Sequence, residues 1–490
     1  MGACALLLAA GPRPVPMQHP SLTPILYAEH SRTVTPALEA ASGSANEAVA
    51  VRAILALGRT KQAAAATVIG AHLNDPRPAV RAMSVYAIGL IVNGPRDATI
   101  LAAMRDSSSA VRYAALDAAD RYAAAGALDS HDVAMVGSSV GALLVSDPDP
   151  LVRARTAATL VSFSSAPNAS ALVALLAHAV QTDRAAIVRE DAMWAIFRGY
   201  AAAAPHDFEL SMLHDPDEIV RIEAVRALGR RKDASDVPAV QALLGDSSWR
   251  VQEQANETLL VLTGKDMTQH MTSIPSFVHV PSPQPDPLAS LPAMPRTPVS
   301  GRPSSPTVDE VANDGILWNA TLDPTTAAAM SGPAPGLHPR VRVVTTQGNV
   351  YVTLFPEWAP FTVQNFLDLA NRGYYDNNRW FRIVPDFVVQ TGDPNDNGNG
   401  DAGYTIGAEE NPIPQESYVI SMGLNYTDGP NAHAIRDSAG TQYYVTLSPQ
   451  LHLDRDFTVF GAVTSGFDVL GRLKESDRVV RIERVADERL

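Results

Sequence analysis

The chain has little cysteine, no excess of basic charge and no long apolar run, and each shortage excludes a class of protein. A single cysteine among 490 residues excludes an internal disulfide framework and a cysteine-rich zinc site. The formal net charge of −14 argues against a nucleic-acid partner, because a polyphosphate backbone would repel the chain. No apolar run is long enough for a transmembrane helix, so we expect no membrane span.

The first residues resemble the core of a signal peptide that lacks its basic start. Residues 3–10 form a short apolar run that ends in small side chains, and no lysine or arginine precedes it. The run is consistent with a signal-peptide remnant and equally with a loose apolar tail. The compartment stays open, with a periplasmic or otherwise exported location favoured over the cytoplasm.

The first half of the chain repeats a short pattern in which an aspartate precedes a valine by five residues. Six copies keep this offset, and a weaker seventh has Asn46 in place of the aspartate. The six pairs are Asp75/Val80, Asp106/Val111, Asp147/Val152, Asp183/Val188, Asp215/Val220 and Asp246/Val251. Repetition at this period predicts an array of similar structural units.

Each copy predicts a pair of helices that stacks on the next pair. The aspartate is expected to cap a helix N-terminus, and the valine belongs to an apolar stripe at helical spacing. An arginine follows the valine in every clear copy except the last, which has Gln252, and it can reach a neighbouring acidic turn. One pair cannot bury its stripe alone, so the copies stack into a solenoid. The pattern resembles HEAT repeats, which implies a surface for a protein partner but no chemistry.

A different pattern begins at residue 341, after a stretch rich in proline and serine that predicts an extended linker. Residues 316–330 are expected to pack as a small element on one of the domains. Apolar residues then alternate with period two, and residues 341–355 predict a hairpin with its turn at Gln347, Gly348 and Asn349. One helix is expected from Pro360 to a stop at Gly373. The short strands that follow predict a closed or nearly closed β-barrel.

The region from residue 341 to residue 485 resembles the cyclophilin family of peptidyl-prolyl isomerases. The resemblance rests on "GNVYVTLFPEWAPFTVQNFLDLANRGYYDNNRWFRIVPDFVVQTGDP", "SMG" at Ser421 and "AGTQYYVTLSPQLHLDRDFTVFGAVTSGFDVL", which keep their order. It implies a closed antiparallel barrel with two helices, and isomerisation of X–Pro bonds in proline-containing protein or peptide clients. We therefore expect a multidomain α plus β protein, with an N-terminal segment at 1–44, a HEAT-repeat α-solenoid at 45–265, a linker at 266–337 and a cyclophilin-like domain at 338–490.

Arg382 stands in the mostly apolar stretch "WFRIVPDFVVQTGD" without a partner nearby in sequence. Rotation about an X–Pro bond must overcome a barrier of about 18–20 kcal/mol, because the rotation breaks amide resonance. A fixed guanidinium that hydrogen-bonds to the prolyl nitrogen of the twisted amide, or polarises the carbonyl, would lower this barrier. The resemblance assigns that catalytic role to Arg382.

The resemblance also implies the remaining site residues. Phe387 would lie under the proline ring beside Val388, Gln390 would bind a substrate carbonyl, and Gln442 would support Arg382. The other substrate-binding residues are Tyr444, Leu453 and Phe457, with His452 at the rim. Strand pleating places Val388 and Gln390 on one face and turns Phe387 to the other, so a twist or bulge is needed to bring Phe387 into the pocket.

Several positions depart from the family pattern, and two alternatives to the leading hypothesis stay open. The departures are Phe381, Asp386, Val388, Tyr444, His452 and Phe457. The loop after Met422 is longer than usual, so either Gly423 or His433 supplies its backbone contact to substrate. In one alternative the domain only binds proline-containing segments as part of an interaction scaffold. In the other the solenoid docks on the barrel and blocks it.

A calcium-loop pattern begins at Asp393 but is incomplete. Asp393, Asn395, Asn397 and Gly398 fit the first, third, fifth and sixth positions. Tyr404 stands at the twelfth position, where a calcium loop needs a bidentate glutamate. We therefore assign no metal, and the isomerase reaction needs no cofactor.

Overall fold

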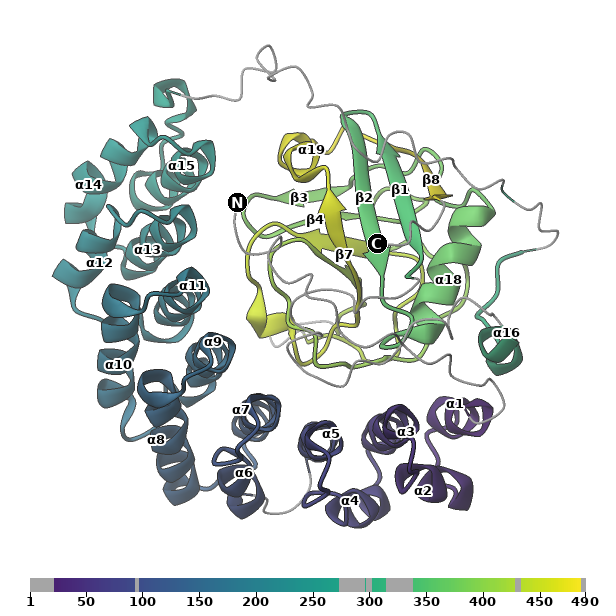
Figure 1. The fold of residues 1–490 in the computed structure, drawn as a ribbon. Coiled ribbons are helices and arrows are strands. Elements are labelled where there is room, and N and C mark those ends of the chain that lie inside the picture. The colour runs from purple at the N-terminus through teal and green to yellow at the C-terminus, as the bar shows by residue number, and fades with distance from the viewer. Residues whose placement is uncertain are drawn as a thin grey trace. The chain divides into compact units, whose positions relative to one another are not determined.

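The structure is a computed structural model that describes residues 22–92, 97–272, 296, 302–313, 338–427 and 433–485 (Figure 1). The chain divides into two compact units. The first unit is Met1–Val80 with Pro283–Leu490, and the second unit is Arg81–Ser282. The apolar run at residues 3–10, the element predicted at 316–330 and most of the predicted linker lie outside the described residues.

Outside the sheet domain, the first unit contains helices from two distant parts of the chain. They are α1 (Thr23–His30), α2 (Pro36–Ser42), α3 (Glu47–Thr60), α4 (Ala63–Gly70) and α16 (Val308–Asn313). Asn46 caps α3 by accepting a hydrogen bond from the backbone N–H of Val49 at 3.3 Å. α16 lies beside α1, and the Tyr27 hydroxyl donates to Asp309 at 2.6 Å (Figure 1). The first helix is therefore packed against an element that comes much later in the sequence.

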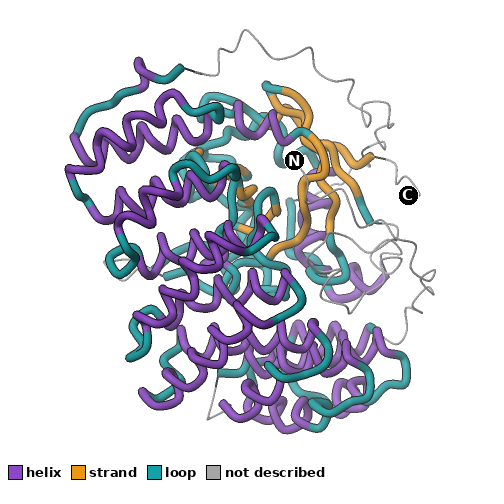
Figure 2. Tube along the Cα trace, turned by 60° about the vertical axis from the view of Figure 1, so that its left-hand side comes forward, coloured by secondary structure: helices purple, strands orange, loops and turns teal. Residues whose placement is uncertain are grey.

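The second unit consists of stacked helices (Figure 2). They are α5 (Pro78–Leu90, entering from the first unit), α6 (Asp97–Ala103), α7 (Ser109–Ala124), α8 (Ser130–Ser146), α9 (Pro150–Thr159), η2 (Leu160–Phe163), α10 (Ala169–Thr182), α11 (Ala186–Ala195), η3 (Ile196–Tyr200), α12 (His206–Met212), α13 (Glu218–Arg231), η4 (Ala234–Asp236), α14 (Val237–Ala242), η5 (Leu243–Gly245), α15 (Trp249–Thr263) and η6 (Thr268–His270). The six repeat valines are buried, which confirms the predicted apolar stripe.

A ladder of ion pairs joins successive repeat copies, as the arginine position predicts. Arg112 pairs with Asp147 through two hydrogen bonds of 2.6 and 2.8 Å. The further pairs are Arg81 with Asp106, Arg153 with Asp183, Arg189 with Asp215, and Arg221 with Asp246. Each arginine thus reaches the aspartate of the following copy.

The predicted role of the repeat aspartate as an N-cap is wrong by two positions. Asp147 accepts the backbone N–H of Asp149 at 3.0 Å, and Asp149 itself is the N-cap of α9. Asp215 relates to Asp217 and α13 in the same way. The carboxylate therefore shapes the turn before the helix, and its oxygens remain accessible to the arginine of the preceding copy.

The sheet domain contains eight antiparallel strands in a curled sheet. They are β1 (Arg340–Thr345), β2 (Gly348–Leu354), β3 (Arg382–Val384), β4 (Val388–Thr391), β5 (Val419–Met422), β6 (Tyr443–Thr446), β7 (Val459–Ser465) and β8 (Val479–Val485). Their order is β3-β4-β6-β5-β7-β2-β1-β8, and an isolated bridge joins Arg379 to Arg478 beside the two ends. The predicted first hairpin is confirmed, but its turn is Thr346–Gln347, because Gly348 and Asn349 already pair in β2 opposite Thr345 and Val344.

Helices α18 (Pro360–Asn371), η7 (Leu451–Leu453) and α19 (Phe467–Arg472) complete this domain. The helix predicted from Pro360 is confirmed as α18. Its Phe366 ring contacts the rings of Tyr375, Tyr443 and Phe460, each with centroids 5.3 Å apart. This aromatic core fixes α18 against the sheet that carries the predicted site.

Candidate active site

Arg382 begins a chain of hydrogen bonds in which every acceptor is an uncharged amide or carbonyl oxygen. It lies opposite Gln390 in the β3–β4 ladder, and its Nη1 donates to Gln390 Oε1 at 3.2 Å. Gln390 Nε2 donates to Gln442 Oε1 at 3.1 Å. Gln442 Nε2 donates to the carbonyls of Gly398 and Gly400 at 3.0 and 3.1 Å. The guanidinium is therefore oriented by the Gln390 amide, which the Gln442 amide in turn anchors to the backbone.

The Arg382 side chain is exposed and keeps its charge available. Within the part of the chain that the structure describes, no carboxylate forms an ion pair with it. Its guanidinium carbon lies 5.2 Å from the centroid of the Phe387 ring. A cation above an aromatic face is attracted by the ring quadrupole, so Phe387 also helps to place the guanidinium.

Phe387 reaches the site because it belongs to the turn before β4. Asp386 adopts a left-handed backbone with φ of 49°. The carbonyl of Asp386 accepts hydrogen bonds from the Ser448 hydroxyl and from Gln450 Nε2, the latter at 3.1 Å. Aspartate tolerates this conformation better than most residues. The turn supplies the change of direction that strand pleating requires, and Phe387 packs on the same cluster as Val388.

An apolar cluster lies beside the arginine. Its buried members are Val388, Tyr444, Leu453 and Phe457, and Phe387 packs against it half-buried. The Phe387 ring stacks on the His452 ring with centroids 6.0 Å apart, and the Tyr444 and Phe457 rings meet edge to face at 5.7 Å. Contacts thus connect all nine predicted site residues, from Gln442 through Arg382 to Phe457.

Gln415 is a buried support for the cluster that sequence reasoning missed. Its Oε1 accepts hydrogen bonds from the Tyr444 hydroxyl at 3.2 Å and from the Ser421 hydroxyl at 3.0 Å. Burial raises the pKa of Tyr444 well above its usual range, so the hydroxyl stays a neutral donor. Gln415 therefore holds the Tyr444 hydroxyl in place.

The long loop after β5 also contributes to the cluster. Leu424 and Ala434 pack against it, and Tyr426 lies with its ring centroid 6.4 Å from that of Phe457. Sequence reasoning missed these three residues, although apolar residues on both sides of a polar segment are a hairpin signal. Gly423 lies beside Gln390, whereas His433 hydrogen-bonds within the loop to Thr427 at 3.1 Å.

The segment with a calcium-loop pattern is organised by one carboxylate. Asp393 is buried and accepts backbone N–H groups of Asn395, Asn397 and Gly398. Burial raises the pKa of Asp393, but these hydrogen bonds outweigh burial and lower it. Among the described residues no group of three or more metal-ligating side chains comes together.

The helices of the described ranges lack the length and hydrophobicity needed to cross a bilayer.

Comparisons with known proteins agree with this architecture. The family model of cyclophilin type peptidyl-prolyl cis-trans isomerases matches residues 340–487, and that of HEAT repeats matches residues 34–120 and 208–274. Peptidyl-prolyl cis-trans isomerase B of Bacillus subtilis is 42% identical over 134 residues, which cover 26% of this chain and 87% of that protein. A peptidyl-prolyl cis-trans isomerase of Helicobacter pylori is 37% identical over 139 residues, or 28% of this chain and 80% of that protein.

Among solved structures, a cyclophilin type peptidyl-prolyl cis-trans isomerase of Cryptosporidium parvum aligns at 24% identity with a TM-score of 0.28. That alignment covers 31% of this chain and 99% of that chain. The sequence identities to the curated relatives are high enough to define the class. The chain belongs to the cyclophilin-type peptidyl-prolyl cis-trans isomerases, and HEAT repeats precede its isomerase domain.

Proposed function

We propose that the chain is a peptidyl-prolyl cis-trans isomerase that acts on X–Pro bonds of protein clients. One observation carries the proposal: Arg382, with a neutral hydrogen-bond partner, lies over Phe387 at the edge of an apolar cluster. The cluster offers the proline ring a surface of suitable chemistry, and the arginine offers a donor beside it. No covalent intermediate is needed, because the reaction is a bond rotation.

Catalysis follows from binding the twisted amide more tightly than either planar form. In the twisted state the prolyl nitrogen regains a lone pair, and Arg382 donates a hydrogen bond to it or polarises the carbonyl. The proline ring is held by Phe387, Val388, Tyr444, Leu453 and Phe457, with His452 at the rim. Gln390 binds a substrate carbonyl and Gln442 keeps Gln390 and Arg382 oriented. Gly423, which lies beside Gln390, supplies the backbone contact of the loop.

The HEAT repeats serve as a surface for a protein partner in this proposal. The net charge of −14 favours a protein over a nucleic acid. We propose that the curled sheet is a closed barrel with α18 and α19 as its two helices. The functional division remains 45–265 for the solenoid, 266–337 for the linker and 338–490 for the isomerase domain.

A protease-coupled prolyl-peptide assay on the full chain tests the proposal. We expect the wild type to accelerate cis-to-trans isomerisation and Arg382→Ala to lower kcat/KM about 100-fold, the effect of losing one preorganised donor. Arg481→Ala is the matched control, since it removes an exposed arginine of β8 that pairs with Glu483. It should keep wild-type activity.

The alternative, an interaction scaffold that only binds proline-containing segments, gives a different result. In that case the wild type and Arg382→Ala both leave the peptide at its spontaneous rate, although the peptide binds. Binding of the same peptide is measured by fluorescence anisotropy. Binding without acceleration by the wild type contradicts the proposed enzyme and supports the scaffold.

A further inference from the structure

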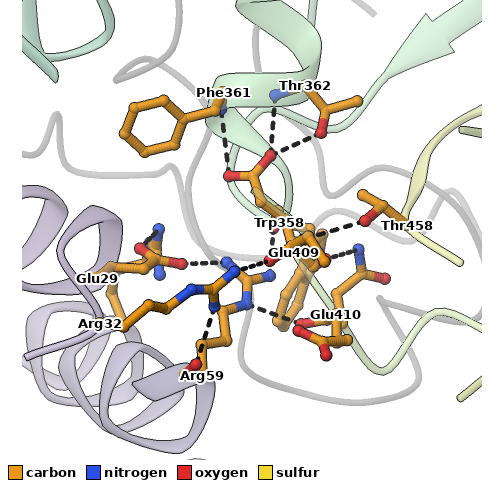
Figure 3. A network of polar contacts seen from close by, with 12 residues as sticks. Glu29, Arg32, Arg59, Trp358, Phe361, Thr362, Glu409, Glu410 and Thr458 are labelled. Carbon is orange, nitrogen blue, oxygen red and sulfur yellow. Dashed lines mark hydrogen bonds and ion pairs between the residues drawn. The ribbon is translucent and has the colours of Figure 1, made fainter. Parts of the chain in front are cut away.

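A fully buried arginine joins the N-terminal helices to the sheet domain (Figure 3). Arg59, near the end of α3, forms an ion pair with Glu29 of α1. Its guanidinium also donates to the carbonyls of Trp358 at 2.7 Å and Glu410 at 2.8 Å. A buried guanidinium is costly unless its donors are paired. These contacts therefore define one docking position of α1 and α3 on the sheet domain.

The first repeat copy departs from the ion-pair ladder of the second unit. Arg52 occupies the ladder position, yet its guanidinium pairs backward with Glu29 of α1. Asp75, at the next ladder position, pairs with Arg77 at 2.8 Å. Two arginines of α3 thus share one buried carboxylate. Because Glu29 also pairs with Arg59, this arrangement supports the arginine that contacts the sheet domain.

A second set of charges extends this contact to the rim. Arg32 pairs with Asp437 at 3.0 Å, and Lys61 pairs with Glu410 at 2.8 Å. Arg436 reaches the same Glu410 at 2.8 Å. Burial raises the pKa of Glu410, but the cations outweigh burial and lower it, so the carboxylate stays charged. Arg32 therefore holds Asp437 directly, and the Glu410 carboxylate holds both Lys61 and Arg436.

Arg436 and Asp437 directly follow the hairpin of the long loop. The strands of that hairpin meet where the Ile435 N–H donates to the Asn425 carbonyl at 2.7 Å. The Asn425 N–H in turn donates to the Ser438 hydroxyl at 2.9 Å. Leu424 and Ala434 of the same hairpin pack on the apolar cluster. The place of Leu424 and Ala434 thus depends on where residues 436–438 are held.

We propose that Arg32 and Arg59 are positioning residues of the isomerase. Arg32, just after α1, donates to the carbonyl of Ala408 at 2.9 Å and pairs with Asp437, and Arg59 of α3 donates to the carbonyl of Glu410. Through these contacts the two arginines fix the hairpin that forms one wall of the proline-binding surface. This inference rests on the proposed function, and it assigns to the first repeat copy a role within the substrate site. The effect falls on substrate binding, because the hairpin packs on the residues that hold the ring.

Arg32→Ala in the full chain tests this inference. We expect the KM of a prolyl peptide to rise about fivefold while kcat stays within twofold. Amide hydrogen exchange of residues 433–438 should become at least tenfold faster. Arg77→Ala is the matched control, because the Arg77 side chain is 25% exposed like that of Arg32 and pairs with an aspartate, Asp75, in the loop before α5. It should change neither KM nor exchange in the loop.

A double-mutant cycle with Asp437→Ala separates positioning from general destabilisation. If Arg32 acts through Asp437, the double variant raises KM no more than the stronger single variant. Additive effects, or an Arg32→Ala variant with wild-type KM and exchange, overturn the inference and leave the proposed function intact. If the wild type lacks activity, the proposed function fails, and the exchange measurement still decides whether the loop depends on Arg32. Arg59→Met should have a larger effect; if that variant does not fold, the Arg32 measurements remain decisive.

Discussion

Glu29→Gln removes the carboxylate that two buried arginines share. Glu29 is 4% exposed, Arg52 is 3% exposed and Arg59 is fully buried. The substitution keeps the shape of the side chain but removes the carboxylate that pairs with both guanidinium groups. Removing one member of a buried ion pair typically destabilises a protein by about 3–5 kcal/mol. We expect the free energy that holds α1 and α3 on the sheet domain to fall by an amount in this range.

The pKa of Glu29 leads to a similar value for the stability that its ion pairs contribute. Burial raises this pKa, but the guanidinium groups of Arg52 and Arg59 outweigh burial and lower it from 4.5 to about 2. Such a depression corresponds to about 3 kcal/mol of stability. Because the folded pKa is depressed, this stability is fully present above about pH 4.5 and is lost as the pH falls toward 2. The helices should therefore loosen in acid.

Hydrogen exchange of the full chain, followed in denaturant at pH 7 and pH 3, measures this effect for each helix. In the wild type, protection of α1 and α3 should fall at pH 3 more than protection of α13. In Glu29→Gln it should already be low at pH 7 and should change less between the two pH values. Glu39→Gln, which alters an exposed glutamate of α2, is the control. Wild-type protection of α3 in Glu29→Gln would refute the reasoning.

Two other substitutions test single features of the fold. Burial raises the pKa of Glu209 to about 7 despite its ion pair with Arg231, so the second unit should lose stability as the pH rises from about 4.5 to 7. In thermal melts, Glu209→Gln should raise the free energy of unfolding by about 1–3 kcal/mol at pH 8 and leave it unchanged at pH 4. An equal rise at both pH values would contradict this prediction. Gly392 has a φ of 89°, and a Cβ added there would lie 2.4 Å from the Thr441 carbonyl oxygen. Gly403 has a similar φ of 86°, but a Cβ added there would meet no atom within 4 Å. Gly392→Ala should therefore destabilise the sheet domain by at least about 2 kcal/mol more than Gly403→Ala in urea unfolding, and equal losses would show that the clash is relieved.

The repeats were the part of the fold most open to sequence reasoning, because the pattern is local. The Asp–Val offset and the following arginine predict both the apolar stripe and the ion pairs between copies. The N-cap prediction was wrong by two positions because the sequence alone does not distinguish an N-cap aspartate from an aspartate two residues before the N-cap. Asp147 and Asp149 stand in one turn, and only the backbone distinguishes their roles.

The site was predictable where a family pattern orders it and unpredictable where the chain departs from that pattern. Strand pleating alone predicts that Phe387 points away from the substrate site, but the left-handed backbone of Asp386 directs Phe387 toward it. The docking through Arg59 had no sequence signal at all. Its partners on the sheet domain are main-chain carbonyls 299 and 351 residues away, which any residue could supply. Only the folded chain brings these groups together.

The central claim is that the Arg382 guanidinium accelerates rotation about an X–Pro bond. NMR exchange spectroscopy of a prolyl peptide, with catalytic amounts of the full chain, measures that rotation without a coupling protease. The account predicts cis–trans exchange far above the uncatalysed rate for the wild type and a loss of about 100-fold for Arg382→Ala. Exchange of equal speed with the wild type and with Arg382→Ala would contradict it.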